Sequence, residues 1–138
     1  MQSVRLVKGT VTVAVATAAC HTLMAAGYAW ARGRAATGEA TMFAGAVEWP
    51  VTTAASWALM PLLPGAGMRV LREHGNTALM VGGGLVWAVL SLAFVDGIDR
   101  PGGFMPLPAL TVWILAGTGL AGAGPGRRRG RPRGPPAR

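Results

Sequence analysis

The chain has 138 residues, of which 51% are hydrophobic and only 13% are charged, and its formal net charge is +8. A soluble domain usually carries about 25% charged residues, so the composition argues against a water-soluble globular domain, while the length allows one domain. A single cysteine, Cys20, excludes an intramolecular disulfide framework.

Four apolar runs approach the ~20 residues that an α-helix needs to cross ~30 Å of hydrocarbon. In chain order they cover residues 10–31, 41–63, 77–95 and 107–124. The fourth opens with Pro106 and Pro108, which suit the start of a helix. The pattern predicts an all-α fold: an integral membrane bundle of four transmembrane helices within residues 1–126, multi-pass in the cell membrane.

The last segment, residues 127–138, reads RRRGRPRGPPAR and is too rich in Arg, Pro and Gly to fold alone. We expect a disordered basic tail that contacts anionic lipid headgroups, where each basic residue contributes ~1 kcal/mol. The candidate lipid contacts are Arg127, Arg128, Arg129, Arg131 and Arg133. Two alternatives remain: an acidic protein partner, and DNA, because Gly130-Arg131-Pro132 resembles the AT-hook core that reads the minor groove. We do not favour nucleic acid, because this likeness is unspecific in a chain rich in Arg, Gly and Pro.

Positive charge predicts the orientation of such a bundle, because cytoplasmic segments carry more Lys and Arg. With the N-terminus inside, the inner segments hold ten basic residues, whereas the outer loops hold three. The outer ones are Arg32, Arg34 and Arg100. Several aromatic residues also gather near the predicted outer ends, as interfacial rings do. We therefore expect both termini in the cytoplasm.

The first run admits a second interpretation. A basic start followed by an apolar run and AWA at residues 29–31 resembles a secretory signal with its cleavage site, and TAAC at residues 17–20 resembles a lipobox. However, the run is longer than the ~7–15 residues of a signal core. The residues after Cys20 also stay apolar. We favour a retained first span, with cleavage as the alternative.

Two polar residues lie inside the predicted spans: His21 near the centre of the first, and Glu48 outward from the centre of the second. On helical wheels both share a face with small or hydroxyl residues such as Thr17 and Thr52. Since these spans would run antiparallel through a short loop, we expect an intramembrane polar pair within one helical turn in depth. Such a pair suits a proton- or cation-responsive site, or simply a neutral hydrogen-bonded acid in the bundle.

A third interpretation makes Glu48 a helix-start residue. Pro50 would then open the helix, with Trp49 in the interfacial belt and the carboxylate at the positive end of the helix dipole. A helix from Pro50 to Pro64 alone is too short for ~30 Å. The longer span is therefore favoured.

Helical spacing also predicts the packed faces. Small residues let helices approach closely in lipid, which favours a seam of Gly84, Ala88 and Ser91 in the third span and the Gly117–Ala121 pair in the fourth. On the second span, Trp57 and Met60 lie opposite Glu48, so we expect both to face acyl chains.

No sequence motif points to chemistry. P-loop, GxGxxG, HExxH and GxSxG patterns are absent, and the two histidines are too far apart to make a Cys/His cluster. We therefore expect no enzyme, and no catalytic, cofactor-binding or metal site. The predicted role is a structural or partner-binding accessory protein that contacts a second membrane protein or another copy of itself. The alternative is a small oligomeric transporter or channel using Glu48 and His21.

Two resemblances rest on layout alone. Four short spans with one membrane acid look similar to the small multidrug resistance exporters, but that family carries its acid in the first span, where this chain has His21. Composition and topology also resemble uncharacterised small four-helix integral membrane proteins of actinobacteria. Neither resemblance implies a site.

Overall fold

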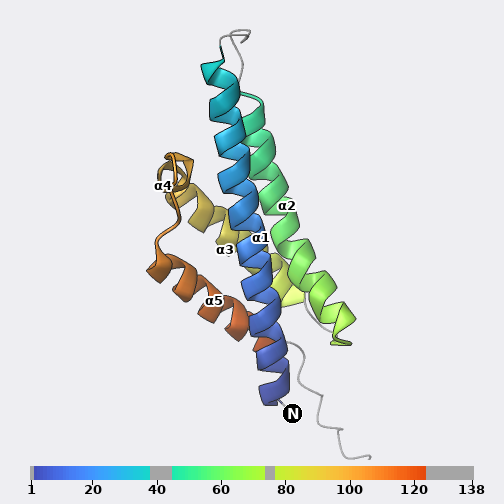
Figure 1. The fold of residues 1–138 in the computed structure, drawn as a ribbon. Coiled ribbons are helices and arrows are strands. Elements are labelled where there is room, and N and C mark those ends of the chain that lie inside the picture. The colour runs from blue at the N-terminus through green and yellow to red at the C-terminus, as the bar shows by residue number, and fades with distance from the viewer. Residues whose placement is uncertain (1, 38–44, 74–76, 124–138) are drawn as a thin grey trace, which may run out of the picture.

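A computed structural model describes residues 2–37, 45–73 and 77–123 of the chain. All regular structure within these ranges is helical, which confirms the predicted all-α class. The helices are α1 Gln2–Ala36, α2 Glu48–Val70, α3 Thr77–Ala93, α4 Val95–Asp99 and α5 Leu107–Gly122 (Figure 1).

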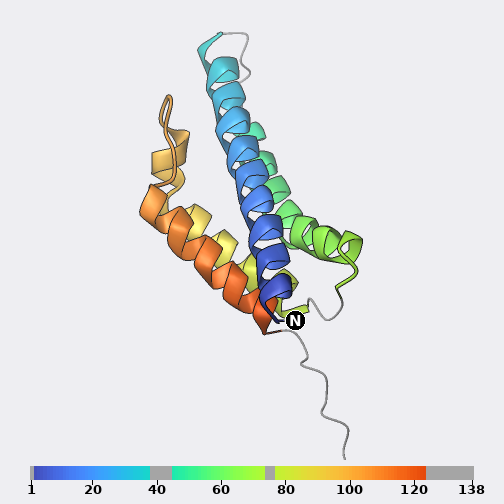
Figure 2. The same cartoon turned by 60° about the horizontal axis from the view of Figure 1, so that its bottom comes forward.

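The four longer helices form a closed ring. Helix α1 packs against α2 on one side and α5 on the other, and α3 contacts both α2 and α5. The antiparallel α1–α2 hairpin is the long axis of the molecule, and its upper end extends beyond α4 in both views (Figures 1 and 2). The short α4 continues almost directly from α3 and contacts α1.

Only α1 is long and apolar enough, by length and composition, to qualify as a membrane span among the described residues. It has 35 residues, or ~52 Å at 1.5 Å per residue. A signal sequence or the core helix of a soluble protein would meet the same criterion. Helices α3 and α5 are apolar but have 17 and 16 residues. The four full-length spans predicted from the sequence are therefore not established by helix length.

Helix α2 begins later in the chain than the second span predicted at residues 41–63. Helix α2 begins at Glu48, two residues before Pro50, after turns at residues 45–47. It then continues through Pro61 and Pro64 to Val70. Residues 41–44 lie outside the described residues. This start matches the helix-start interpretation of Glu48, and the continuation past Pro64 gives α2 its length.

The packed face of α2 is rotated from the predicted one. Met60, expected to face lipid, is 1% exposed, and Trp57 is half-buried and donates to Ser91. The buried residues of α2 are Thr52, Thr53, Ser56, Met60, Pro64, Gly65 and Met68. Ser91 and the Gly117–Ala121 pair are buried as predicted, whereas Gly84 and Ala88 of the predicted seam are half-buried. The rotation follows from the buried hydroxyls of α2, which face the neighbouring helices.

Candidate functional site

His21 lies in the middle of α1 and is 8% exposed. Its Nε2 accepts a hydrogen bond from the backbone N–H of Met105 at 3.2 Å. The imidazole also stacks on Phe104, with ring centroids 5.4 Å apart and planes 8° from parallel. The histidine therefore holds the loop that leads into α5.

This loop descends along α1. At its upper end, Asp99 binds Arg32 of α1 at 2.8 Å, whereas Met105 meets His21, ~16 Å further down α1 at 1.5 Å per residue. A turn at residues 100–102 precedes this descent, and Gly102 adopts a positive φ of 69° in it.

Few donors in the descending loop need a partner. Pro101 and Pro106 have no backbone N–H, and the N–H of Gly103 donates to the carbonyl of Arg100 at 2.7 Å. A buried backbone N–H without a partner costs about 1–3 kcal/mol, and Met105 is 1% exposed. His21 supplies the acceptor that the N–H of Met105 requires.

His21 also lines a cavity of about 560 Å³ between α1, the loop and α5. A ring nitrogen that accepts an N–H carries no hydrogen of its own. The neutral imidazole therefore has its hydrogen on Nδ1. The remaining cavity wall is mostly apolar, with Leu110 and Ile114 contributed by α5. The arrangement can bind an apolar molecule, but it offers no nucleophile paired with a base.

Glu48 has different partners. Its Oε2 accepts the backbone N–H of Gly45 at 2.9 Å, and its Oε1 lies 3.5 Å from Nε of Arg34. The carboxylate thus closes the turn at the start of α2 and pairs with the last turn of α1. The structure does not bring His21 and Glu48 together; each has its own local partner in the described chain.

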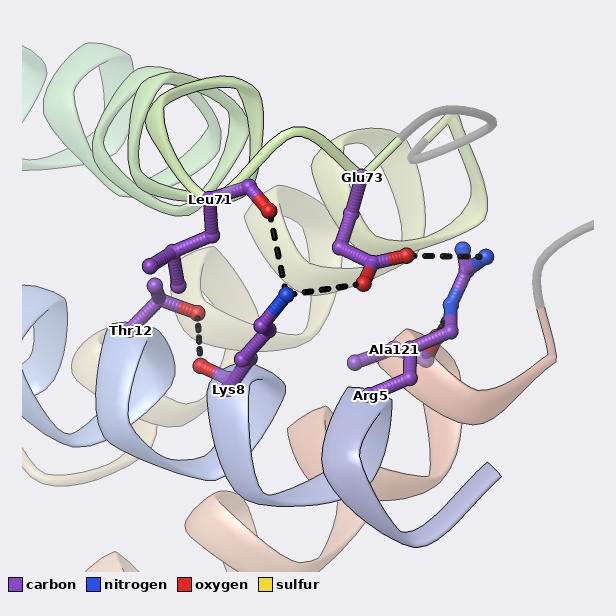
Figure 3. A network of polar contacts seen from close by, with 6 residues as sticks. All are labelled: Arg5, Lys8, Thr12, Leu71, Glu73 and Ala121. Atoms are coloured by element: carbon purple, nitrogen blue, oxygen red, sulfur yellow. Dashed lines mark hydrogen bonds and ion pairs between the residues drawn. The ribbon is translucent and has the colours of Figure 1, made fainter. Parts of the chain in front are cut away.

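At the opposite end of the molecule, three charged residues tie α1 to the ends of α2 and α5 (Figure 3). Nζ of Lys8 lies 3.2 Å from Oε1 of Glu73 and donates to the carbonyl of Leu71 at 3.1 Å. NH1 of Arg5 lies 3.8 Å from Oε2 of Glu73, and its Nε donates to the carbonyl of Ala121 at 3.0 Å. Carbonyls in the last turn of a helix lack intrahelical partners and attract cations. We call Arg5, Lys8 and Glu73 the basal cluster.

The way α2 ends positions Glu73. Arg72 adopts a left-handed backbone conformation with φ 58°. This turn lets the N–H of Glu73 donate to the carbonyl of Met68 at 2.8 Å, and the N–H of Arg72 to that of Arg69 at 2.9 Å. The pair of bonds is the Schellman arrangement of a helix C-terminus. Sequence reasoning counted Arg5 and Lys8 only as topology signals and missed Glu73, although an acid beside an otherwise basic inner segment was a visible signal.

Buried hydroxyls and rings join the helices. Three indoles and one phenol each bond a hydroxyl on a neighbouring helix, at 2.7–3.0 Å. The pairs are Tyr28 with Thr53, Trp57 with Ser91, Trp87 with Ser56, and Trp113 with Thr17. No fully enclosed side-chain nitrogen or oxygen atom in the described residues is left without a partner. The hydroxyls and indoles between the helices therefore satisfy one another.

The remaining predicted positions give no further site. The tail arginines, Arg127 to Arg133, lie outside the described residues. Within the described ranges, no group of three or more His, Cys, Asp or Glu side chains is placed to hold a metal ion. Cys20 is fully buried, and its Sγ lies 3.6 Å from the carbonyl of Ser56.

No protein-family model matches the chain, and no curated protein or solved structure shows significant similarity to it. The geometry of the described residues therefore carries the functional argument by itself.

Proposed function

We propose that this protein is a multi-pass integral membrane protein of structural or partner-binding type, without catalytic activity. Its four spans are α1, α2, α3, and α5 with the loop that precedes it. The single observation that carries the proposal is an apolar surface: large apolar side chains face outward on every long helix, while hydroxyls and indoles pair with one another among the buried side chains.

The outward apolar residues cover all four long helices, and each is more than half exposed. They include Val11 and Val15 on α1, Val51 and Leu62 on α2, Leu85 and Val89 on α3, and Val112 and Leu115 on α5. Soluble monomers rarely expose contiguous apolar patches beyond a few hundred Å². Lipid, by contrast, tolerates such a surface, and inside it hydroxyls serve as contacts between helices.

Charge is confined to the two ends of the helices. Four segments, residues 9–31, 49–68, 77–95 and 101–123, contain no Asp, Glu, Lys or Arg. Each has about 20 residues, which as helix covers ~30 Å of hydrocarbon. The fourth segment combines the descending loop with α5, so the loop adds to the length that the 16 residues of α5 cover across the hydrocarbon.

The basal cluster lies at the end that we assign to the cytoplasm. Arg69 and Arg72 are exposed at this end of α2, and the tail arginines follow α5 in sequence. An excess of Lys and Arg favours the cytoplasmic side, and such residues attract anionic lipid headgroups. We therefore propose cytoplasmic termini and headgroup contacts at this face.

A structural or partner-binding role fits the interior better than transport. A transport site would need intramembrane polar groups that are free to bind and release an ion. Glu48 is engaged at a helix start, four interior hydroxyls are committed to neighbouring helices, and His21 is bonded to the backbone of Met105 and not to an acid. The outer apolar face is where a second membrane protein or another copy would pack.

Cysteine labelling tests the membrane assignment, since Cys20 is the only native thiol. In a Cys20→Ala background, single cysteines replace Ser3 at the base, Val15 in the charge-free belt and Ala36 at the far end. A membrane-impermeant maleimide should label Ala36→Cys on intact cells and Ser3→Cys only after lysis. Val15→Cys should stay unlabelled in both cases, although Val15 is 63% exposed, because lipid covers it.

The matched readout is extraction of membranes at alkaline pH, which should leave the protein in the pellet. Release into the wash, together with rapid labelling of Val15→Cys, would contradict the proposal, because a soluble fold leaves that position in water. Labelling of Ser3→Cys on intact cells would contradict the orientation alone.

A further inference from the structure

The cavity beside His21 has features that packing alone does not require. Its volume is about 560 Å³, within the range of small-molecule sites, and its lining is mostly apolar. On the α1 side the small residues Ala14 and Ala18 leave room, and Leu110 and Ile114 of α5 face them. Phe104 lines the loop side, stacked on the imidazole and 71% exposed.

Two hydrogen-bond donors that line this cavity have no acceptor among the described residues. The first is Nδ1–H of His21, which has no partner among the described residues, whereas Nε2 is occupied by Met105. The second is the hydroxyl of Thr22, which also lines the cavity and has no hydrogen bond within the described chain. By contrast, other threonines inside the helices donate to the carbonyl four residues earlier: Thr10, Thr12, Thr17, Thr52, Thr53, Thr111 and Thr118.

We propose that this cavity binds a membrane-soluble molecule with a flat, carbonyl-bearing ring of the quinone class. A carbonyl oxygen has two lone pairs and no hydrogen, so it suits Nδ1–H of His21 and the hydroxyl of Thr22. The apolar walls suit a ring, and aromatic neighbours such as Phe104 favour stacking with it. The inference rests on the proposed membrane location, because the ligand would enter from lipid.

A phospholipid ester also carries carbonyl oxygens, but its flexible chains gain nothing from an aromatic wall. The ring is therefore the occupant that the lining favours. Displacement by phospholipid separates the two in the test.

The test uses the full-length protein, purified in mild detergent and titrated with decylubiquinone. Quenching of tryptophan fluorescence reports binding, because Trp113 is hydrogen-bonded to Thr17 on the cavity wall. We expect saturable quenching. Ala18→Phe, which fills the cavity, should weaken binding at least tenfold. Ala19 is exposed like Ala18 but lies outside the lining, so Ala19→Phe should bind as the parent does.

A second matched pair removes one donor without changing shape. Thr22→Val should weaken binding by about threefold to tenfold, the effect of one hydrogen bond. Thr111→Val alters a hydroxyl outside the lining and should leave binding unchanged. Thermal unfolding of each variant verifies that the fold is retained.

Quenching that does not saturate, or that is equal in Ala18→Phe and Ala19→Phe, would overturn the site. Full displacement of the quinone by excess short-chain phosphatidylcholine would overturn the ring assignment. Alkaline extraction of the same membranes reports separately on the membrane proposal, so a protein that stays in the pellet without binding refutes only the ligand site.

Discussion

At the residue scale, His21 is first of all a structural acceptor. A histidine inside an apolar helix invites a proton-transfer hypothesis, yet Nε2 faces the backbone N–H of Met105. A backbone N–H can only donate, so this geometry requires Nε2 of His21 to be unprotonated. Protonation at Nε2 would place its N–H opposite the N–H of Met105, and the hydrogen bond that holds the loop before α5 would be lost.

Replacing His21 separates these roles. His21→Leu should lower the free energy of unfolding by about 1–3 kcal/mol, because the N–H of Met105 would be buried without an acceptor. His21→Gln keeps an acceptor at a similar reach and should recover most of this loss. The measurement is thermal or denaturant unfolding in mild detergent. Equal stability of the Leu variant and the parent protein would show that the bond to Met105 contributes little.

At the scale of elements, close approach of backbones sets how α1 packs. A Cβ on Gly27 would overlap the side chain of Thr52 on α2, and a Cβ on Gly117 of α5 would lie 2.7 Å from Cγ1 of Val13. Small residues at such contacts let helices associate in lipid without a hydrophobic driving force. These two positions therefore hold α1 between its neighbours.

Gly27→Ala and Gly33→Ala form a matched test on one helix. The first should destabilise the protein by about 1–3 kcal/mol, because Thr52 is short, branched and unable to move away. The second has open space around the added Cβ, and it should be neutral or up to about 1 kcal/mol more stable, as alanine favours helix. Unfolding in detergent measures both. Equal effects at the two positions would refute the close contact.

The sequence predicts part of this packing and misses the rest for physical reasons. Apolar runs and proline positions correctly predicted the helical class and the starts of α3 at Thr77 and α5 at Leu107. Small-residue spacing correctly predicted the burial of Gly117. The rotation of α2 and the descending loop were missed, because they depend on which hydroxyl meets which ring on another helix. The bond from Met105 to His21 spans 84 residues of chain and leaves no local pattern.

At the scale of the whole molecule, α1 is the helix on which the others assemble. It contacts α2, α4 and α5, and it supplies the acceptors for Trp113 and Met105. Its fully buried side chains are Val13, Ala16, Cys20, Met24 and Tyr28. Loss of α1 would leave the hydroxyl of Thr53 and the indole of Trp113 without their partners, and unpaired buried polar groups are costly.

We therefore predict that residues 1–31 stay in the mature protein. Tryptic mass mapping of the protein purified from membranes should recover the peptide from Gly9 to Arg32, which spans both candidate cleavage points. Ala29→Gln removes a small residue that signal cleavage after Ala31 would require. Because we expect no cleavage there, the substitution should change neither the measured N-terminus nor the yield. Conversely, a chain expressed from Arg32 onward should fail to accumulate, because Thr53 and Trp113 would lose their partners on α1. N-terminal sequencing that begins at Arg32 or Cys20 would contradict this prediction and make the α1 contacts those of a precursor.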